Sequence, residues 1–540
     1  MKAGSEAMKS WKTTAPRLVV LTSAFFAVFL NFAFFRNVIA VYPLSWGRLP
    51  FLLSLCLVLA CATALILLPL ATRYTLKPVL IFALLASSIA SYFMNAFNVV
   101  IDADMLRNAA QTNRAEARDL LNPKLFAHFF LLGVLPSLLI YRTKIRHGSL
   151  KSDTLSNIKW MTMTVVVALA VVLGFSRNYA SFFREHKPLR LYANPIQWMR
   201  STVKYSRGAV KAEARAPKAI GADADIPASD TDRELVILVV GEAVRADRFS
   251  LNGYVKQTNP LLSGEEIVNF PQFYSCGTST AVSVPCMFSV FPREECTVKK
   301  AHETENLLDV LTHAGVHVLW RDNNSSSKGV ADRVLYENFQ GPEANPLCDV
   351  ECRDEGMLSG LQEYIDRTDR GDILIVLHQM GNHGPAYYKR YPAEFERFQP
   401  VCRSNQLEEC TDEQIENAYA NAVLYTDYFL SRVIDLLKRN SGAFETAMVY
   451  MGDHGESLGE NGIYLHGLPY FMAPEAQTHV PAVMWFGDSF KIDRRALRER
   501  AKGRFSHDNL FHTMLGMMEV RTAVYDRKLD ILARISHQRP

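Results

Sequence analysis

Five long apolar stretches without a formal charge constrain the fold of this chain most strongly. They are Leu18–Phe35, Leu49–Ala71, Pro78–Val100, Leu125–Tyr141 and Trp160–Phe175. A membrane core of roughly 30 Å takes about 20 helical residues to cross. The second and third stretches meet that length, and the others reach it with flanking residues. Five such stretches in succession favour membrane-spanning helices over buried helices of a soluble domain. The first stretch also ends without the small-residue cleavage site of a signal peptide.

Basic residues in the loops predict how the chain is oriented in the membrane. Lysine and arginine concentrate at the N-terminus, in the second loop (Arg73 and Lys77) and in the fourth loop (residues 142–159). Short loops rich in positive charge remain cytoplasmic. The third loop, Ile101–Lys124, then faces outward, and everything after about residue 176 lies outside the cytoplasm.

The cysteines support this orientation independently. Seven of the nine follow residue 270, and six of these form close pairs in the sequence: Cys276/Cys286, Cys348/Cys352 and Cys402/Cys410. Close pairs in an exported domain favour local disulfides, with reduced structural thiols as the alternative. Cys296 has no assigned partner.

Composition divides the chain into three regions. We expect a five-span transmembrane domain over residues 1–176, an interfacial segment and linker over 177–232, and a catalytic domain over 233–540. Residues 177–205 are aromatic and basic, which suits a membrane–water interface, either as an amphipathic bridging helix or as a loop. The 59 basic and 55 acidic residues are nearly balanced, which gives no sign of a nucleic-acid partner.

The last region alternates strand-length apolar runs with helical patterns. Leu235–Val240, Val316–Trp320, Ile373–Leu377, Ala447–Met451 and Val480–Phe486 are predicted as buried parallel strands, with helices over Asn306–His313 and Asn417–Lys438. This alternation is typical of an α/β domain with a mainly parallel sheet. In such sheets ligands bind beyond the carboxyl ends of the strands.

Carboxylates and imidazoles follow three of these strands. Glu242 comes directly after the first, Asp453 and His454 follow the fourth, and the segment from His378 to His383 follows the third. His466 stands a little further on. Carboxylate oxygen and histidine nitrogen are the ligand atoms that zinc takes. The sequence therefore predicts a metal site at this edge of the sheet.

The segment Ser275–Cys286 is dense in hydroxyl groups and leads into an apolar stretch. Thr or Ser at such a place is usually a helix cap. The alternative is a nucleophile, because a helix start favours negative charge and a metal acidifies a bound hydroxyl. Composition leaves both Thr278 and Thr280 open for that role.

Six motifs together resemble the membrane-bound lipid A phosphoethanolamine transferases, a family of the alkaline phosphatase superfamily that includes the mobile colistin-resistance enzymes. They are Gly241-Glu242, Arg245-Ala-Asp247, Cys276-Gly-Thr-Ser-Thr280, Trp320-Arg-Asp-Asn-Asn324, His378-Gln-Met-Gly-Asn-His383-Gly-Pro385 and Gly452-Asp-His-Gly-Glu-Ser-Leu-Gly-Glu-Asn461. The resemblance covers nearly the whole chain. It implies a bundle of five transmembrane α-helices followed by an alkaline-phosphatase-like (sulfatase-type) α/β domain.

The resemblance also implies roles for individual residues. Thr280 matches the nucleophile, and Glu242, Asp453, His454 and the Thr280 oxygen match the ligands of one tightly bound zinc ion. His383 and His466 match the histidines that hold a second, weaker zinc ion or the phosphate of the donor. The disulfides match as Cys276–Cys286, Cys348–Cys352 and Cys402–Cys410. Contacts to the donor head group match Asn108, Thr112, Glu116, Ser325 and Lys328. The residues of segment 106–116, taken without the resemblance, predict a solvated helix.

The implied activity is transfer of phosphoethanolamine from phosphatidylethanolamine to a phosphate of lipid A, through a phosphoethanolamine–threonine intermediate. His383 or His466 would protonate the leaving group. The expected protein is a monomer of the bacterial inner membrane with its catalytic domain in the periplasm, and its product would weaken the binding of polymyxins. The alternatives are a hydrolase of the same superfamily, a transferase for another glycan, and a membrane sensor without activity.

Overall fold

Two units make up the protein, and neither is continuous in the sequence. The structure is a computed structural model and describes residues 12–112, 114–211 and 216–533. One unit comprises Met1–Leu106 and Leu121–Ser206, and the other comprises Arg107–Leu120 and Arg207–Pro540. The expected domain limits of 1–176, 177–232 and 233–540 follow chain order instead, and they stay predictions.

The first unit contains the helices that are long and apolar enough to cross a membrane. Within the described residues these are α3 with its 3-10 extension (Leu49–Leu70), α4 (Leu76–Phe97), the continuous run from α7 to α8 (Pro123–Arg142) and α9 (Leu150–Gly174). The first expected span is broken into α1 (Ala15–Phe29) and α2 (Phe32–Val41), which are bent by 54°. Four helices therefore qualify alone, and five if this bent pair forms one span.

A pair of buried asparagines explains the break between α1 and α2. Asn31 Nδ2 donates to the Phe26 carbonyl at 2.8 Å, and Asn31 Oδ1 accepts from the Asn194 amide at 2.9 Å. Asn194 Nδ2 donates to the carbonyls of Leu30 and Ser87 at 3.0 and 2.9 Å. Lipid offers no hydrogen-bond partners, so backbone groups freed by a bend need internal ones. The two side chains supply them.

The remaining segments of the amino-terminal half are mostly helical. The polar loop forms α5 (Ala103–Gln111) and α6 (Arg114–Leu120), and the aromatic, basic segment forms α10 (Ser176–Glu185) and α11 (Ile196–Lys211). The interfacial segment is thus helical rather than a loop. Helix α9 begins ten residues before the expected Trp160, because the Ser149 side chain caps it by accepting from the Ser152 amide. Short strands β1 (Lys12–Thr14) and β2 (Lys144–Arg146) pair in parallel.

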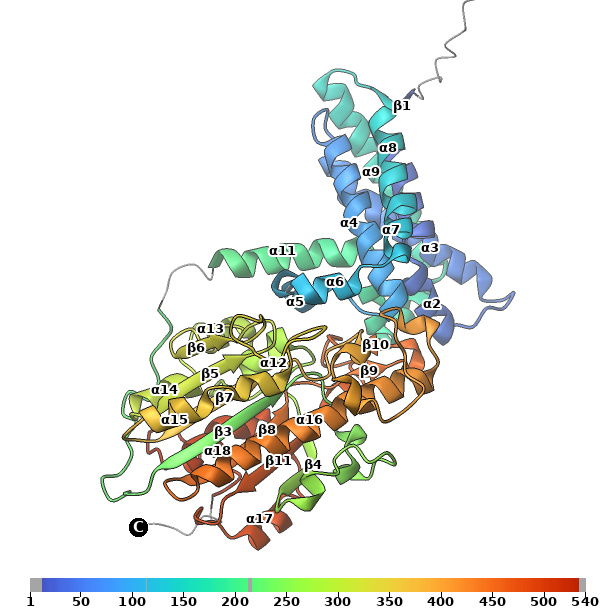
Figure 1. Ribbon diagram of the computed structural model, residues 1–540. Coiled ribbons are helices and arrows are strands. Elements are labelled where there is room, and N and C mark those ends of the chain that lie inside the picture. Colours follow the sequence, from blue (N-terminus) through green and yellow to red (C-terminus); the bar gives the residue numbers. More distant parts are fainter. Residues whose placement is uncertain (1–11, 113, 212–215, 534–540) are drawn as a thin grey trace, which may run out of the picture. The chain divides into compact units, whose positions relative to one another are not determined.

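An eight-stranded sheet forms the centre of the second unit (Figure 1). Its strands, in spatial order, are β12 (Phe505–Ser506), β4 (Val268–Tyr274), β11 (His479–Phe486), β8 (Glu445–Gly452), β3 (Glu234–Gly241), β7 (Ile373–His378), β5 (His317–Asp322) and β6 (Leu335–Asn338). All five predicted strands are present, and the α/β fold is confirmed. Strands β3, β5, β6, β7 and β8 are parallel to their neighbours within this group.

One predicted direction is wrong, because β11 runs antiparallel to both β8 and β4. A parallel return requires a crossover, usually a helix. The chain between β8 and β11 carries only 3-10 turns and the short hairpin of β9 (Ser457–Leu458) and β10 (Tyr464–Leu465). The apolar run of β11 indicates burial and does not encode direction.

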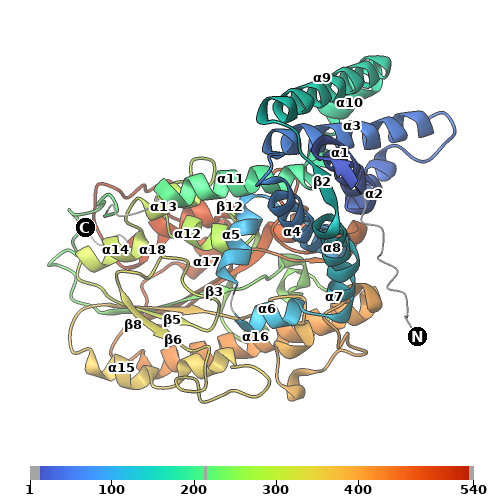
Figure 2. The same ribbon diagram turned by 90° about the horizontal axis from the view of Figure 1, so that it is seen from above.

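Alternate residues of the central strands face two helical layers (Figure 2). Val236, Leu238 and Val240 share one apolar core with α14 (Leu307–His313), α17 (Arg494–Arg500) and α18 (Leu510–Met517). Leu235, Ile237 and Val239 share the other with α15 (Leu361–Arg367) and α16 (Asp412–Asn440). Helices α14 and α16 confirm the two predicted helices, and each begins with a capping box.

Replacing Asn31 with alanine should lower the free energy of unfolding of the full-length protein by about 1–3 kcal/mol, because it leaves buried backbone groups without partners. Thermal unfolding in detergent would measure the change. Asn178→Ala removes an exposed asparagine and should leave stability unchanged. Equal stability of the two variants would contradict a structural role for the Asn31–Asn194 pair.

Candidate active site

The ends of β3 and β8 bring the predicted acidic residues together. Gly241 and Gly452 are paired in the parallel ladder, so Glu242 and Asp453 leave the sheet side by side. Glu242, Asp453 and His454 are all 0% exposed. His454 Nε2 lies 3.3 Å from Glu242 Oε1 and 3.5 Å from Asp453 Oδ2. The sheet register therefore builds the predicted cluster from two strands far apart in the sequence.

Thr280 completes this cluster from a third element. It is the first residue of α12 (Thr280–Met287), which begins after Ser279 in extended conformation. Thr280 Oγ1 donates to Glu242 Oε2 at 2.8 Å and lies 3.2 Å from His454 Nε2. The hydroxyl thus sits at a helix start, which favours negative charge on its oxygen.

The hydroxyls of Thr278 and Thr280, the two candidate nucleophiles in the sequence, have different partners in the structure. Thr278 Oγ1 donates to the backbone carbonyl of Leu468 at 2.7 Å. Its hydroxyl therefore holds a loop in place, whereas that of Thr280 contacts the acidic cluster. This geometry favours Thr280 as the nucleophile.

A strained turn positions Glu242. Ala243 adopts a left-handed conformation with φ of +53°, which costs a residue with a side chain of order 1–3 kcal/mol. Its amide donates to Asp453 Oδ1 at 3.1 Å. Gly381 packs against the same turn, where a Cβ would come within 2.8 Å of the Glu242 carbonyl oxygen. The turn is held by β8 on one side and by the loop after β7 on the other.

The pKa values show that the cluster attracts positive charge. Burial and the Glu242 carboxylate raise the pKa of Asp453 to about 6. Burial opposes charge on Glu242 too, but His454, His383 and His466 hold its pKa well below the usual value. Burial likewise opposes charge on His454, yet Asp453 and Glu242 raise its pKa to about 10. Two buried carboxylates thus need a compensating cation.

These residues fit a metal ion. One ligand atom from each of Glu242, Asp453 and His454 lies within 4.8 Å of the others. Buried Glu242 Oε1 and Asp453 Oδ2 have no hydrogen-bond partner among the described residues. His454 Nδ1 lies 2.8 Å from the Gly455 carbonyl, which leaves Nε2 as the nitrogen for a ligand bond. A metal would satisfy the atoms that the protein leaves unpaired.

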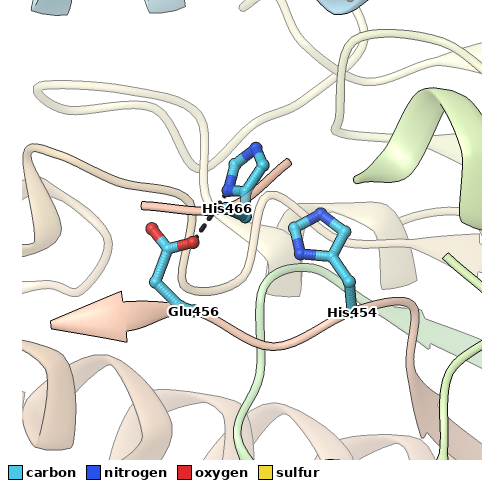
Figure 3. A group of neighbouring side chains, drawn as sticks. All are labelled: His454, Glu456 and His466. Atoms are coloured by element: carbon cyan, nitrogen blue, oxygen red, sulfur yellow. Dashed lines mark hydrogen bonds and ion pairs between the residues drawn. The ribbon is translucent and has the colours of Figure 1, made fainter. Parts of the chain in front are cut away.

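A second group of possible ligands adjoins the first (Figure 3). One ligand atom from each of His454, Glu456 and His466 lies within 4.8 Å of the others. His466 Nδ1 lies 2.7 Å from Glu456 Oε2, and the rings of His454 and His466 have centroids 4.3 Å apart. The His383 ring lies 5.5 Å from that of His466. The two predicted histidines are therefore close together beside the first group.

The residues expected at the donor head group fall into two segments of the second unit. Lys328 is buried and contacts Ser325. Burial lowers the pKa of Lys328, although Glu116 and Glu242 oppose this shift. Glu116 is 7% exposed. Asn108 and Thr112 are half-buried, and Thr112 Oγ1 donates to the Asn108 carbonyl at 2.8 Å.

Asp119 anchors the segment Arg107–Leu120 to the rest of the second unit. Its carboxylate pairs with Lys389 and, at 3.0 Å, with Arg390 Nη2. Arg390 Nε donates to the His383 carbonyl at 2.6 Å. A chain of polar contacts therefore runs from the outer loop to the loop that carries His383.

Comparison with known proteins gives matches along nearly the whole chain. A family model described as Sulfatase matches residues 234–520, and one described as Phosphoethanolamine transferase EptA/EptB matches residues 59–210. Over 517 residues the chain is 42% identical to the phosphatidylethanolamine transferase Mcr-2 of Escherichia coli, covering 93% of this chain and 95% of that protein. It is 39% identical over 528 residues to the phosphoethanolamine transferase EptA of Salmonella typhimurium, covering 95% and 96%.

A solved structure agrees with this assignment. The integral membrane lipooligosaccharide phosphoethanolamine transferase A (EptA) from Neisseria meningitidis matches with a TM-score of 0.93 and 36% identity, covering 98% of this chain and 100% of that one. The chain belongs to the phosphoethanolamine transferase family. The resemblance inferred from the motifs is confirmed, and this phosphoethanolamine transferase is an enzyme with membrane-spanning N-terminal helices and a sulfatase-type domain.

Sequence reasoning missed three residues that support the site of this phosphoethanolamine transferase. Asn324 Nδ2 donates to Glu242 Oε2 at 2.8 Å, and Glu456 binds His466. His378 is fully buried, and its Nδ1 lies 3.0 Å from Asp322 Oδ2. All three lie within the motifs at strand ends. Their position at the strand ends could have marked them as candidate site residues, but only the contacts in the structure identify their partners.

The cysteines of the transferase differ in part from the expected pattern. Disulfides Cys348–Cys352 and Cys402–Cys410 are formed. The expected Cys276–Cys286 bridge is not, because both residues are free thiols in the structure. The Cys286 thiol contacts those of both Cys276 and Cys296. Cys286 thus has two neighbours with which it can pair, a choice that spacing alone does not reveal.

Glu242→Gln and Asp453→Asn should each weaken divalent-metal binding by more than roughly 10–100-fold, the loss typical when a residue that only supports a ligand is changed. Each substitution removes a ligand and one of the two carboxylates whose negative charge balances the metal. Metal content by mass spectrometry and titration after chelation would measure it. Glu499→Gln, which alters an exposed carboxyl on α17, should bind metal normally. Full metal content in both site variants would contradict the assignment.

Asp119→Asn should make the segment Arg107–Leu120 open more often, because the amide loses the ion pairs to Lys389 and Arg390. A loss of about 1–2 kcal/mol corresponds to roughly 5–30-fold faster cleavage when local opening limits proteolysis. Trypsin digestion of the native protein, followed by mass mapping of cuts after Arg107 and Arg118, measures this. Glu394→Gln changes an exposed carboxyl and should cleave at the wild-type rate. Equal rates for both variants would refute the anchoring role.

Proposed function

We propose that this enzyme transfers phosphoethanolamine from phosphatidylethanolamine to a phosphate of lipid A through a covalent intermediate on Thr280. The observation that carries the proposal is the Thr280 hydroxyl at the start of α12, 2.8 Å from Glu242 Oε2 and 3.2 Å from His454 Nε2. The names of Mcr-2 and EptA support the reaction class and the donor.

Glu242, Asp453, His454 and Thr280 are the residues that would hold a zinc ion. When bound, zinc supplies Lewis acidity that lowers the pKa of a hydroxyl in contact with it. Glu242 Oε2 accepts the Thr280 hydrogen bond and is placed to receive its proton. Asn324 donates to the same carboxylate oxygen and keeps it oriented toward Thr280.

In the first step Thr280 Oγ1 attacks the phosphorus of the donor. The bond from phosphorus to the glycerol oxygen breaks, and diacylglycerol leaves after accepting a proton. His466 is the favoured proton donor, because Glu456 binds its Nδ1 and so fixes the ring beside that of His454 (Figure 3). His383 is the alternative, and both histidines are also placed to bind the donor phosphate or a second metal ion.

In the second step a phosphate oxygen of lipid A attacks the phosphoethanolamine group on Thr280. The bond from phosphorus to Thr280 Oγ1 breaks, and the threonine recovers its proton. Such a two-step exchange is ping-pong catalysis. The added amine offsets phosphate charge, so the modified outer membrane should bind polymyxins less strongly.

The donor head group carries a phosphate and an ammonium. The buried amine of Lys328, with Ser325 beside it, suits the phosphate. Glu116, Asn108 and Thr112 on the outer loop supply the carboxylate and polar groups that suit the ammonium. Glu116 lies close enough to Lys328 for its carboxylate to oppose the lowering of the Lys328 pKa.

We further propose that the protein is a monomer of the bacterial inner membrane with its catalytic unit in the periplasm. The membrane-spanning helices, the basic loops on one side and the two disulfides support this placement. It puts the active site in the compartment that both lipid substrates reach.

Wild-type protein mixed with phosphatidylethanolamine vesicles should gain the mass of one phosphoethanolamine group, and added lipid A should remove it. Thr280→Ala and a chelated sample should gain nothing, because the first lacks the nucleophile and the second lacks the metal. Intact-mass spectrometry would measure the adduct. Thr278→Ala is the matched control, since that hydroxyl donates to the Leu468 carbonyl instead of the acidic cluster, and it should retain the adduct.

The other outcomes distinguish the competing functions. Release of ethanolamine phosphate without an adduct would indicate a hydrolase. An adduct that lipid A does not remove would indicate another glycan as the acceptor. An adduct on Thr280→Ala would overturn the assigned nucleophile.

A further inference from the structure

The buried carboxylate of Asp354 holds a loop that borders the active site. Asp354 is 4% exposed and begins a short 3-10 turn, Asp354–Leu358, outside the motifs that the sequence places at the site. Its Oδ1 accepts from the Met380 amide at 2.8 Å, and its Oδ2 accepts from the Gly381 amide at 3.1 Å. Both amides belong to the loop between β7 and His383. One side chain therefore holds two consecutive peptide groups of a loop that carries a predicted site residue.

Two side-chain amides complete the surroundings of the same carboxylate. Asn323 Nδ2 donates to Asp354 Oδ1 at 2.8 Å, and Gln379 Nε2 donates to Asp354 Oδ2 at 3.2 Å. All four partners are donors, so the group between them must accept at both of its oxygens, as an ionised carboxylate does. An asparagine side chain would turn its amino group toward two of these donors and leave them unsatisfied, which is costly in a buried place.

The loop that Asp354 holds lies directly against the backbone of Glu242. The Asn382 amide donates to the Glu242 carbonyl at 3.0 Å. Gly381 has a φ of +51°, and a Cβ at this position would come within 2.8 Å of the same carbonyl oxygen and 3.0 Å of the Glu242 amide nitrogen. Protein interiors are close-packed and transmit displacements of this kind. A shift of the loop would therefore move Glu242.

The segment before Asp354 is itself held in place. The disulfide Cys348–Cys352 closes a short loop just before Asp354, with a sequence separation of four residues. Asn323 Nδ2, which donates to Asp354, also donates to the Cys352 carbonyl at 3.0 Å. The carboxylate thus connects a disulfide-closed segment to the loop after β7.

We propose that Asp354 is a positioning residue for the transfer of phosphoethanolamine. By fixing the loop after β7, it keeps Glu242 where that carboxylate contacts Thr280. Its effect passes through the loop, because its partners are two backbone amides and two side-chain amides rather than the acidic cluster. This inference deepens the proposed function and rests on the roles assigned there to Glu242 and Thr280.

Asp427 on α16 provides a matched control. It is fully buried, and its two oxygens accept from the consecutive amides of Leu261 and Leu262 at 2.9 and 3.0 Å. It holds two peptide groups in the same way as Asp354, but in a segment outside the motifs of the site. Asp354→Asn and Asp427→Asn should therefore lower the melting temperature alike, whereas only Asp354→Asn should disturb the active site.

Three measurements on the full-length protein in detergent test this difference. In the metal-free protein, Asp354→Asn should make peptides that contain Met380 and Gly381 exchange with deuterium roughly tenfold faster, because these amides lose their acceptor. Its zinc dissociation constant should rise roughly 10–100-fold, the loss typical when a residue that supports a metal ligand is changed. Its mass gain with phosphatidylethanolamine vesicles should also be slower. Asp427→Asn should match wild type in all three measurements.

Gly381→Ala tests the contact with Glu242 independently, and it gives an answer even if Asp354→Asn does not fold. Its Cβ would press on the Glu242 backbone, so zinc binding should weaken roughly tenfold or more. Gly253→Ala, at a φ of +93° with open space around it, should bind zinc like wild type. Equal zinc affinity within either pair of variants, Asp354→Asn and Asp427→Asn or the two glycine variants, would overturn the positioning role. A wild-type protein that binds zinc but gains no mass would instead refute the proposed function, and the zinc comparison would still test Asp354.

Discussion

Two buried carboxylates, Glu242 and Asp453, lie side by side at the carboxyl edge of the sheet, and their need for a cation organises the active site. Neither is exposed to water, and one oxygen of each has no hydrogen-bond partner among the described residues. Two carboxylates that share one buried site can both be ionised only if a positive charge compensates them. The raised pKa of His454 expresses the same demand. A metal ion held by these residues would satisfy it and, in the proposed reaction, would supply Lewis acidity beside the Thr280 hydroxyl.

The fold supplies the rigidity that such a cluster needs. The parallel pairing of β3 with β8 sets the spacing of the two carboxylates, and the Asp453 side chain accepts from the amides of both Ala243 and His454. Helix α12 then presents Thr280 to them. A strained turn at Ala243 persists because β8 and the Gly381 loop surround it. Strain and like charge are thus concentrated at the proposed active site, as is typical of active sites.

Local patterns predicted the elements of this protein well. Apolar length identified the membrane helices, and alternation of strands and helices identified the α/β unit. The same patterns failed where a distant partner decides the outcome. The bend between α1 and α2 depends on Asn194, more than 160 residues away, and β11 runs antiparallel because no crossover helix follows β8. Cys286 has two thiol neighbours, which spacing along the chain does not reveal.

The sequence alone determined the kinds of residue at the site and their position at strand ends, because motif and periodicity are local properties. It also determined the membrane unit, because hydrophobic length is local too. Only the tertiary structure decided which atoms meet. It distinguished Thr280 from Thr278, assigned Asn324 to Glu242 and Glu456 to His466, and brought Asp354 to the amides of Met380 and Gly381. The physical reason is that strand register and helix packing, and not spacing along the chain, set the distances on which hydrogen bonds, pKa values and metal binding depend.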